Sequence, residues 1–140
     1  MAELKIEELK RYFSRRDKLG VVSVYLFGSH ALGRSHRESD IDLGVLLNHS
    51  RYPQRRDRFE MRIRLSSELI AELGQQAVDV VILNDVPPQL GRRIVHQGVR
   101  LYCGDPALDH AFQRDIQLRA ADLDPFLRRM RKIKLEALAR

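Results

Sequence analysis

Apolar and polar positions alternate in blocks along this chain, and the blocks predict both strands and helices. Apolar, β-branched runs bounded by glycine, proline or polar residues are typical of buried strands. Such runs cover residues 21–27, 40–47, 77–83 and 99–103. We therefore expect a sheet of about four short strands.

Apolar residues at helical spacing occupy much of the remaining chain. Residues 2–16 and 90–96 fit helices, and a longer segment, 54–73, ends before Gly74. The predicted apolar face of this long helix consists of Phe59, Ile63, Leu69, Ile70 and Leu73. Its other face carries Arg55, Arg56, Arg58, Arg62 and Arg64. Most arginine rows of this kind are solvated helix faces, and the alternative is a binding surface.

From about residue 105 onward the chain is predicted to be helical. We expect an interruption at Asp124-Pro125, because the residue before a proline disfavours helical backbone. This segment is strongly basic, with Arg128, Arg129, Arg131, Lys132, Lys134 and Arg140. It either closes the core or offers a surface to a partner or to a second copy of the chain.

Length and composition narrow the class of protein. A chain of 140 residues, 44% of them hydrophobic, is large enough for one domain with a real core. Strands alternating with helices predict a single α/β (α+β) domain over residues 1–140, a short mixed sheet with helices packed on it. No apolar run approaches the ~20 residues of a membrane span, and the first residues do not resemble a signal peptide. A single cysteine, Cys103, excludes an internal disulfide, so we expect a cytoplasmic protein.

The charge permits several kinds of partner. A net charge of +6 allows contact with nucleic acid, nucleotides or an acidic protein. However, the chain has no Trp, and most of its five Phe and four Tyr residues lie in apolar runs, so it lacks an aromatic platform for bases. We therefore expect RNA binding to be weak and sensitive to salt.

The break between the first two predicted strands carries the candidate chemistry. The first strand ends at Gly28-Ser29, and the second opens with Asp40-Ile41-Asp42. Alternate residues of a strand point to one face, so Asp40 and Asp42 project together while Ile41 enters the core. Two such carboxylates repel each other and lose hydration, and a divalent cation is the usual way to offset that cost. Gly28 lets the backbone approach a ligand and Ser29 adds a hydroxyl, so a metal-bound polyphosphate suits the site.

A third carboxylate, Asp79, lies inside the apolar run 77–83. A lone aspartate in a hydrophobic strand is costly unless it is paired or bound to metal. Either Asp79 faces water on an edge strand, or it joins Asp40 and Asp42 in one metal site.

These residues resemble a known pattern. Gly28-Ser29, ten intervening residues and Asp40-x-Asp42 are similar to the signature of the DNA polymerase β-like nucleotidyltransferase superfamily. The small size resembles its minimal nucleotidyltransferase (MNT) branch. The resemblance implies the polymerase β-like fold, with Asp40, Asp42 and Asp79 as catalytic residues that bind two Mg²⁺ ions.

The same resemblance implies a nucleotide site and a donor. Gly28 and Ser29 would hold the β- and γ-phosphates of ATP, the implied donor of AMP. Arg34 is similar to an arginine common in the family's loop, and its alternative role is that of a surface charge.

The resemblance also implies a partner. MNT proteins commonly act as antitoxins that pair with HEPN ribonuclease toxins, and some transfer AMP to a toxin tyrosine. Fewer than 40 residues follow the fourth predicted strand, too few for a separate acceptor domain, so a second protein would present the hydroxyl. Two alternatives remain open: a non-catalytic antitoxin that masks its partner by binding, or transfer to RNA or to a small molecule, the latter at a homodimer cleft.

Overall fold

A computed structural model describes residues 2–15, 20–28, 41–74 and 77–139 of the chain. The elements of this part are, in chain order, α1 (Ala2–Arg15), β1 (Val21–Phe27), β2 (Ile41–Leu47), α2 (Arg55–Leu73), β3 (Val78–Ile82), α3 (Pro88–Gln97), β4 (Val99–Cys103) and α4 (Pro106–Leu138). Each expected strand and helix is present, with small shifts at the ends.

The four strands form one mixed sheet in the order β3-β2-β1-β4. β1 runs antiparallel to both of its neighbours, β2 and β4, whereas β2 and β3 are parallel. The predicted α/β fold with a short mixed sheet is therefore confirmed. β3 lies at one edge of this sheet.

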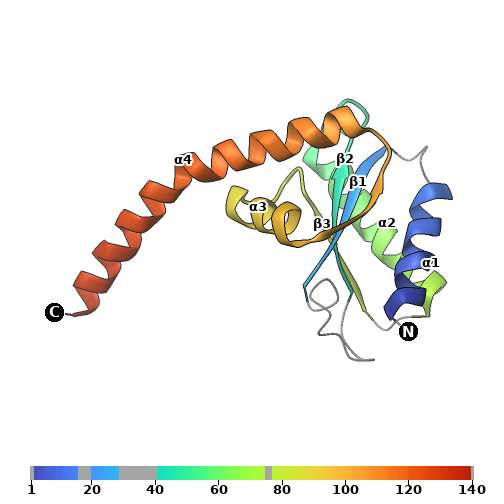
Figure 1. Cartoon of the computed structure of the whole chain (residues 1–140), viewed down its shortest axis with the longest axis horizontal. Coiled ribbons are helices and arrows are strands. Elements are labelled where there is room, and N and C mark those ends of the chain that lie inside the picture. Colours follow the sequence, from blue (N-terminus) through green and yellow to red (C-terminus); the bar gives the residue numbers. More distant parts are fainter. Residues whose placement is uncertain (1, 16–19, 29–40, 75–76, 140) are drawn as a thin grey trace.

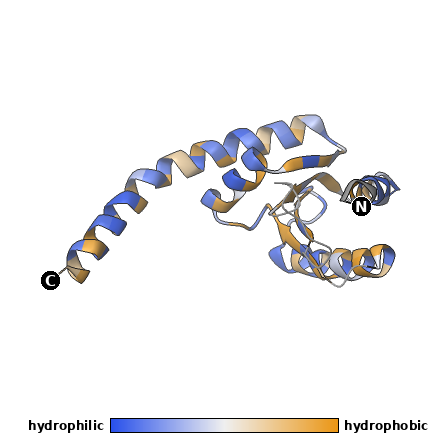
Figure 2. Ribbon diagram, turned by 60° about the horizontal axis from the view of Figure 1, so that its bottom comes forward, coloured by the Kyte–Doolittle hydropathy of each residue, from blue (hydrophilic) through white to orange (hydrophobic). Residues whose placement is uncertain are grey.

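Helices cover both faces of the sheet (Figure 1). On one face, Phe13 of α1 and Leu65 of α2 belong to the same buried cluster as Leu43 of β2. On the other face, Ile94 of α3 packs with Tyr25 of β1. Hydrophobic residues accordingly concentrate in the strands between these helix layers (Figure 2). Both faces of the central strands are buried, which explains why their sequences are apolar with little alternation.

The buried face of α2 differs from the expected one. Met61, Leu65 and Leu69 are buried, while Phe59 and Ile63 are 54% and 52% exposed. Arg58 lies on the buried face at 8% exposure, so part of the arginine row is not solvated. The prediction was wrong for Phe59 and Ile63. The predicted face and the buried face both have apolar residues at helical spacing, and the charge of Arg58 argued against the face that is buried.

The predicted interruption at Asp124-Pro125 is also wrong, since α4 continues through Pro125 as one helix of 33 residues. The Asp124 carboxylate accepts hydrogen bonds from Gln89 Nε2 (2.5 Å) and Arg92 Nη1 (3.0 Å) of α3, which hold the turn before the proline. Proline removes one backbone donor and favours bending, and α4 curves along its length (Figure 1). At about 1.5 Å per residue the helix is about 50 Å long, and its second half extends beyond the sheet.

Candidate nucleotidyltransferase site

Strand register brings two of the predicted site carboxylates together. Asp42 of β2 is the direct partner of Asp79 of β3 in the parallel pair. Neighbouring strands lie about 4.8 Å apart, and partner residues of a parallel pair point to the same face. That face is the one covered by α3, because a Cβ on Gly44, two residues after Asp42, would touch Ile94. Asp79 thus lies beside Asp42 and also faces water on an edge strand, so its position agrees with both of the alternatives set out from the sequence.

Gly28 closes the site from the side of β1. It follows Phe27, the register partner of Asp42, and has a φ of +76°, in the left-handed region. A Cβ placed on Gly28 would overlap Asp42 Oδ2. A side chain at this position would therefore suffer both backbone strain and a collision with the carboxylate. Glycine therefore lets the end of β1 lie directly against Asp42 without displacing its carboxylate.

Asp79 is held in place from α2. The Asp79 side chain is 58% exposed, and its Oδ1 lies 3.8 Å from Nη2 of Arg62. The same guanidinium donates through Nε to the carbonyl oxygen of Val80 at 2.6 Å, so it is fixed along the edge of β3. An exposed pair of this kind contributes little to stability. It does place a positive charge beside one of the two site carboxylates.

The other predicted site residues, Ser29, Arg34 and Asp40, lie outside the described residues. Within the described ranges no cluster of three or more His, Cys, Asp or Glu side chains could hold a metal ion. The described donors are the carboxylates of Asp42 and Asp79. Carboxylate oxygens are the protein ligands that Mg²⁺ prefers, commonly one or two of them together with substrate phosphates. The chemistry of this pair therefore fits Mg²⁺, with further ligands needed from elsewhere.

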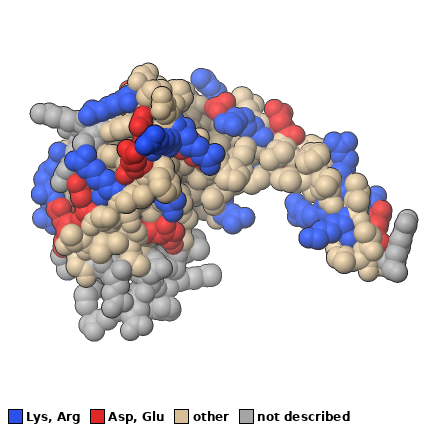
Figure 3. Space-filling view, turned by 180° about the vertical axis from the view of Figure 1, so that it is seen from behind, with Lys and Arg blue, Asp and Glu red and all other residues tan. Residues whose placement is uncertain are grey.

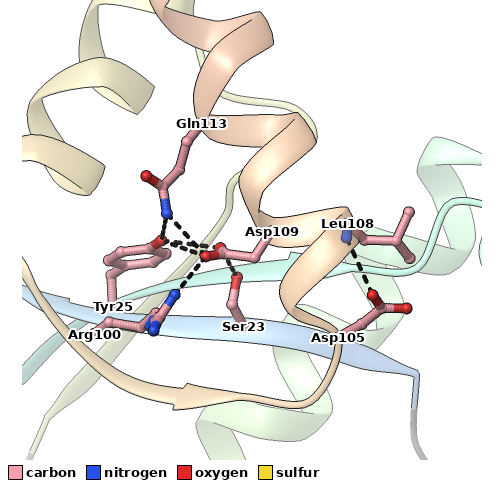
Figure 4. Close-up of polar contacts among 7 residues, drawn as sticks. All are labelled: Ser23, Tyr25, Arg100, Asp105, Leu108, Asp109 and Gln113. Atoms are coloured by element: carbon pink, nitrogen blue, oxygen red, sulfur yellow. Dashed lines mark hydrogen bonds and ion pairs between the residues drawn. The ribbon is translucent and has the colours of Figure 1, made fainter.

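A buried polar cluster between α4 and the sheet was not foreseen from the sequence (Figure 4). The Asp109 carboxylate of α4 is fully buried and accepts hydrogen bonds from four side chains. The donors are Ser23 Oγ (2.6 Å), Tyr25 Oη (2.9 Å), Arg100 Nη1 (3.0 Å) and Gln113 Nε2 (2.9 Å). Within the described part of the chain no buried side-chain nitrogen or oxygen lacks a partner. The cluster joins α4 to β1 and β4, and β1 leads directly to Gly28.

The cluster shifts the acidity of its members. Burial alone raises the pKa of Asp109, but the hydrogen bonds from Ser23, Tyr25, Arg100 and Gln113 outweigh it, so the pKa lies below the usual carboxyl value. Burial and the hydrogen bond to Asp109 together raise the pKa of Tyr25. Asp109 is therefore ionised and Tyr25 neutral at physiological pH. The available sequence signal was weak: a serine inside the apolar strand, and Asp109 and Gln113 one helical turn apart.

A partly buried ion pair fixes the turn after β3. Arg58 of α2 donates through Nε and Nη2 to the two carboxylate oxygens of Asp85, at 2.9 and 2.8 Å. Its Nη1 donates to the carbonyl oxygen of Tyr52 at 2.8 Å. This fork geometry accounts for the burial of an arginine on the core side of α2. It also fixes α2 relative to β3, the strand that carries Asp79.

Comparison with known proteins agrees with this geometry. The family described as polymerase beta, nucleotidyltransferase, matches residues 7–107. This chain belongs to the polymerase beta nucleotidyltransferase family. The resemblance inferred from Gly28-Ser29, Asp40-x-Asp42 and their spacing is thereby confirmed at the level of the family.

Individual relatives of this nucleotidyltransferase are toxin–antitoxin proteins. The protein adenylyltransferase MntA of Shewanella oneidensis is 35% identical over 79 residues, which are 56% of this chain and 52% of that protein. The match thus spans about half the length of the curated relative. A solved toxin–antitoxin structure with AMP-PNP is similar with a TM-score of 0.67 and 28% identity, covering 95% of this chain and 98% of that one. A mutant MntA–HpeT toxin–antitoxin structure gives a TM-score of 0.61 and 26% identity, covering 86% and 87%.

Among the helices of the described residues, none is both long and apolar enough to span a bilayer.

Proposed function

We propose that this protein transfers AMP from ATP to a hydroxyl group, that of a tyrosine, on a partner protein, and that it acts as the antitoxin of a HEPN-type ribonuclease toxin. The observation that carries the proposal is the register pairing of Asp42 with Asp79, with Gly28 lying against Asp42. Family membership and the toxin–antitoxin relatives support it. The relative with AMP-PNP supports an adenine nucleotide as donor.

The residues divide the chemistry among them. The backbone at Gly28, with Ser29 and Arg34, would hold the triphosphate. Asp42 and Asp79, with Asp40, would hold Mg²⁺, which when bound supplies positive charge for the phosphates and for the leaving group.

Asp79 is the carboxylate that the acceptor hydroxyl would approach. It lies on the edge strand and is more than half exposed, so a hydroxyl group has access to it from outside the sheet. The hydroxyl oxygen attacks the α-phosphorus of ATP and forms a new P–O bond. The bond to the pyrophosphate oxygen breaks and pyrophosphate leaves, while the hydroxyl proton passes to Asp79 or to water.

The projecting half of α4 supports a protein partner. Its apolar side chains Phe126, Met130, Ile133, Leu135 and Leu138 are all about half exposed or more. Lys and Arg side chains gather on this part of the helix, with few acidic groups (Figure 3). A helix of this composition suits an apolar partner surface with acidic residues, and we propose that the toxin docks there.

The test uses the purified chain with the HEPN-type protein encoded beside it, ATP and Mg²⁺. The partner should gain mass in steps of one AMP group, and its ribonuclease activity should fall in parallel. Asp42→Asn should abolish the mass gain. Asp115→Asn is the matched control, because Asp115 is an exposed aspartate of α4 whose ion-pair partner among the described residues is Arg119.

Two other functions give different outcomes in the same experiment. If Asp42→Asn still neutralises the toxin and the toxin mass is unchanged, the protein acts by binding alone. The exposed apolar row of α4 is the observation that favours this second candidate. If AMP appears instead on RNA or on a small molecule, the acceptor has been misassigned while the donor chemistry stands.

A further inference from the structure

A groove lined by α2 side chains runs along the free edge of β3 and begins at Asp79. Its first hollow, of about 280 Å³, is lined by Asp79, Ile63 and Phe59, among others. The second hollow, of about 180 Å³, is lined by Phe59, Arg55 and Val86, among others. Both hollows share Phe59 and Arg62, so together they form one feature, which we call the β3-edge groove.

Phe59 and Ile63 make this groove apolar, although neither side chain is part of the hydrophobic core. They are 54% and 52% exposed, and α2 packs on the sheet through a different face. Among the described residues, the other exposed large apolar side chains are Val99 of β4 and several of α4. Phe59 and Ile63 are thus the exposed apolar pair that adjoins a site carboxylate.

The order of strands assigns the groove to one of the two substrates. Gly28 directly follows β1, Asp42 lies on β2 and Asp79 lies on β3, in that spatial order across the sheet. The phosphate-binding backbone is therefore at the inner side, and Asp79 is at the outer edge. A group that comes from beyond β3, where the groove lies, reaches Asp79 without crossing the nucleotide.

The edge of β3 is closed to an added strand. Ser66 Oγ donates to the carbonyl oxygen of Val78 at 2.7 Å, and Arg62 Nε donates to that of Val80 at 2.6 Å. These two outward carbonyls would otherwise accept hydrogen bonds from a neighbouring strand. An occupant of the groove must therefore be recognised through its side chains, as a helix or a turn would be.

The charges along the groove indicate which kind of partner segment fits it. At the end of the groove away from Asp79, Arg55 is exposed, while the nearby Asp85 is neutralised by its two hydrogen bonds from Arg58. The first hollow holds the Arg62–Asp79 pair, which is balanced. The groove thus presents apolar side chains with a positive charge at one end, which is complementary to an apolar segment that carries a carboxylate.

We infer that the β3-edge groove receives the segment of the acceptor protein that bears the modified hydroxyl, an apolar helix or turn with an acidic flank. The inference rests on the proposed function, and it separates two roles. The projecting half of α4 holds the partner, and the groove brings the hydroxyl to Asp79.

The experiment compares two acceptors: the HEPN-type protein, which needs the groove, and N-acetyltyrosinamide, which is too small to use it. The double variant Phe59→Gln/Ile63→Gln should lower the rate of AMP transfer to the protein by at least about tenfold. Transfer to N-acetyltyrosinamide and the affinity for Mg-ATP should be unchanged. Leu118→Gln is the matched control, since Leu118 is equally apolar and 62% exposed but lies on α4 outside the groove.

A charge reversal gives a second arm. Arg55→Glu should weaken transfer to the protein several-fold, and its neighbour Arg56→Glu, outside the groove and paired with Glu60, should not. If Phe59→Gln/Ile63→Gln modifies the protein as fast as the wild type does, the groove assignment is overturned and the proposed function stands. If that variant loses transfer to both acceptors alike, the change has disturbed the donor site and the assignment is likewise overturned.

Binding distinguishes failure of the inference from failure of the proposed function. If the wild type binds the HEPN-type protein by calorimetry but transfers no AMP, the proposed chemistry fails. The groove is then supported when the double variant loses at least about tenfold in affinity, and refuted when its affinity is unchanged. If the wild type neither binds nor modifies the protein, both proposals are refuted.

Discussion

Replacing Asp109 with asparagine tests the buried cluster that joins α4 to the sheet. The substitution preserves shape but removes the charge and turns one acceptor oxygen into a donor that faces other donors (Figure 4). Asp109 is fully buried and accepts from Ser23, Tyr25, Arg100 and Gln113. Removing one partner of a buried ion pair typically costs about 3–5 kcal/mol. Arg100 is half exposed and regains water, so we expect about 3 kcal/mol for Asp109→Asn.

The loss should be visible in thermal unfolding. For a domain of this size about 1 kcal/mol corresponds to roughly 3 °C, so Asp109→Asn should lower Tm by about 10 °C. Asp115→Asn is the control, because the exposed Asp115–Arg119 pair contributes at most about 1 kcal/mol.

The pH dependence of this loss has a definite sign. The pKa of Asp109 is lower in the folded state, so its ionised form contributes stability that is fully present above the ordinary carboxyl pKa of about 4. That contribution disappears as the pH falls through the lowered, folded-state pKa. The Tm difference between the wild type and Asp109→Asn should therefore be constant near neutral pH and shrink in acid. An unchanged Tm at neutral pH, or a difference that grows on acidification, would refute the reasoning.

Four further predictions concern the site and the surfaces. Gly28→Ala should abolish Mg-ATP binding, measured by calorimetry, and should lower the free energy of unfolding by about 1–3 kcal/mol, because the left-handed backbone and the contact with Asp42 both oppose a side chain. Asp79→Asn should leave nucleotide binding largely intact but reduce turnover by orders of magnitude in single-turnover assays, and equal losses in both would show an ordinary ligand role. Truncation before Asp124 should spare Mg-ATP binding and impair transfer to the partner protein; undiminished transfer would place docking elsewhere. RNA affinity should be weak and fall steeply with salt in a filter-binding titration, and a tight complex at physiological salt would contradict this.

Local patterns in the sequence were sufficient for the strands of this fold. Each strand is a short apolar run with clear breaks, and the break at Gly28 is required by a backbone conformation that disfavours any side chain. The alternation of a strand also predicts that Asp42 points away from the core while Ile41 enters it, and Ile41 is buried at 1% exposure. These features depend on residues that are adjacent in the sequence, so they can be predicted from the sequence alone.

The tertiary structure decided which distant residues meet. The pairing of Asp42 with Asp79 depends on the register of two strands separated by α2, and no local periodicity specifies that register. The burial of Arg58 depends on Asp85, and the continuity of α4 through Pro125 is accompanied by hydrogen bonds from α3 to Asp124. Arg58 on its own would disfavour burial, and Pro125 on its own would disfavour a helix. In both cases contacts with residues distant in the sequence offset that cost. The buried charge of Asp109 follows the same rule, because its cost is offset only after β1, β4 and α4 have come together.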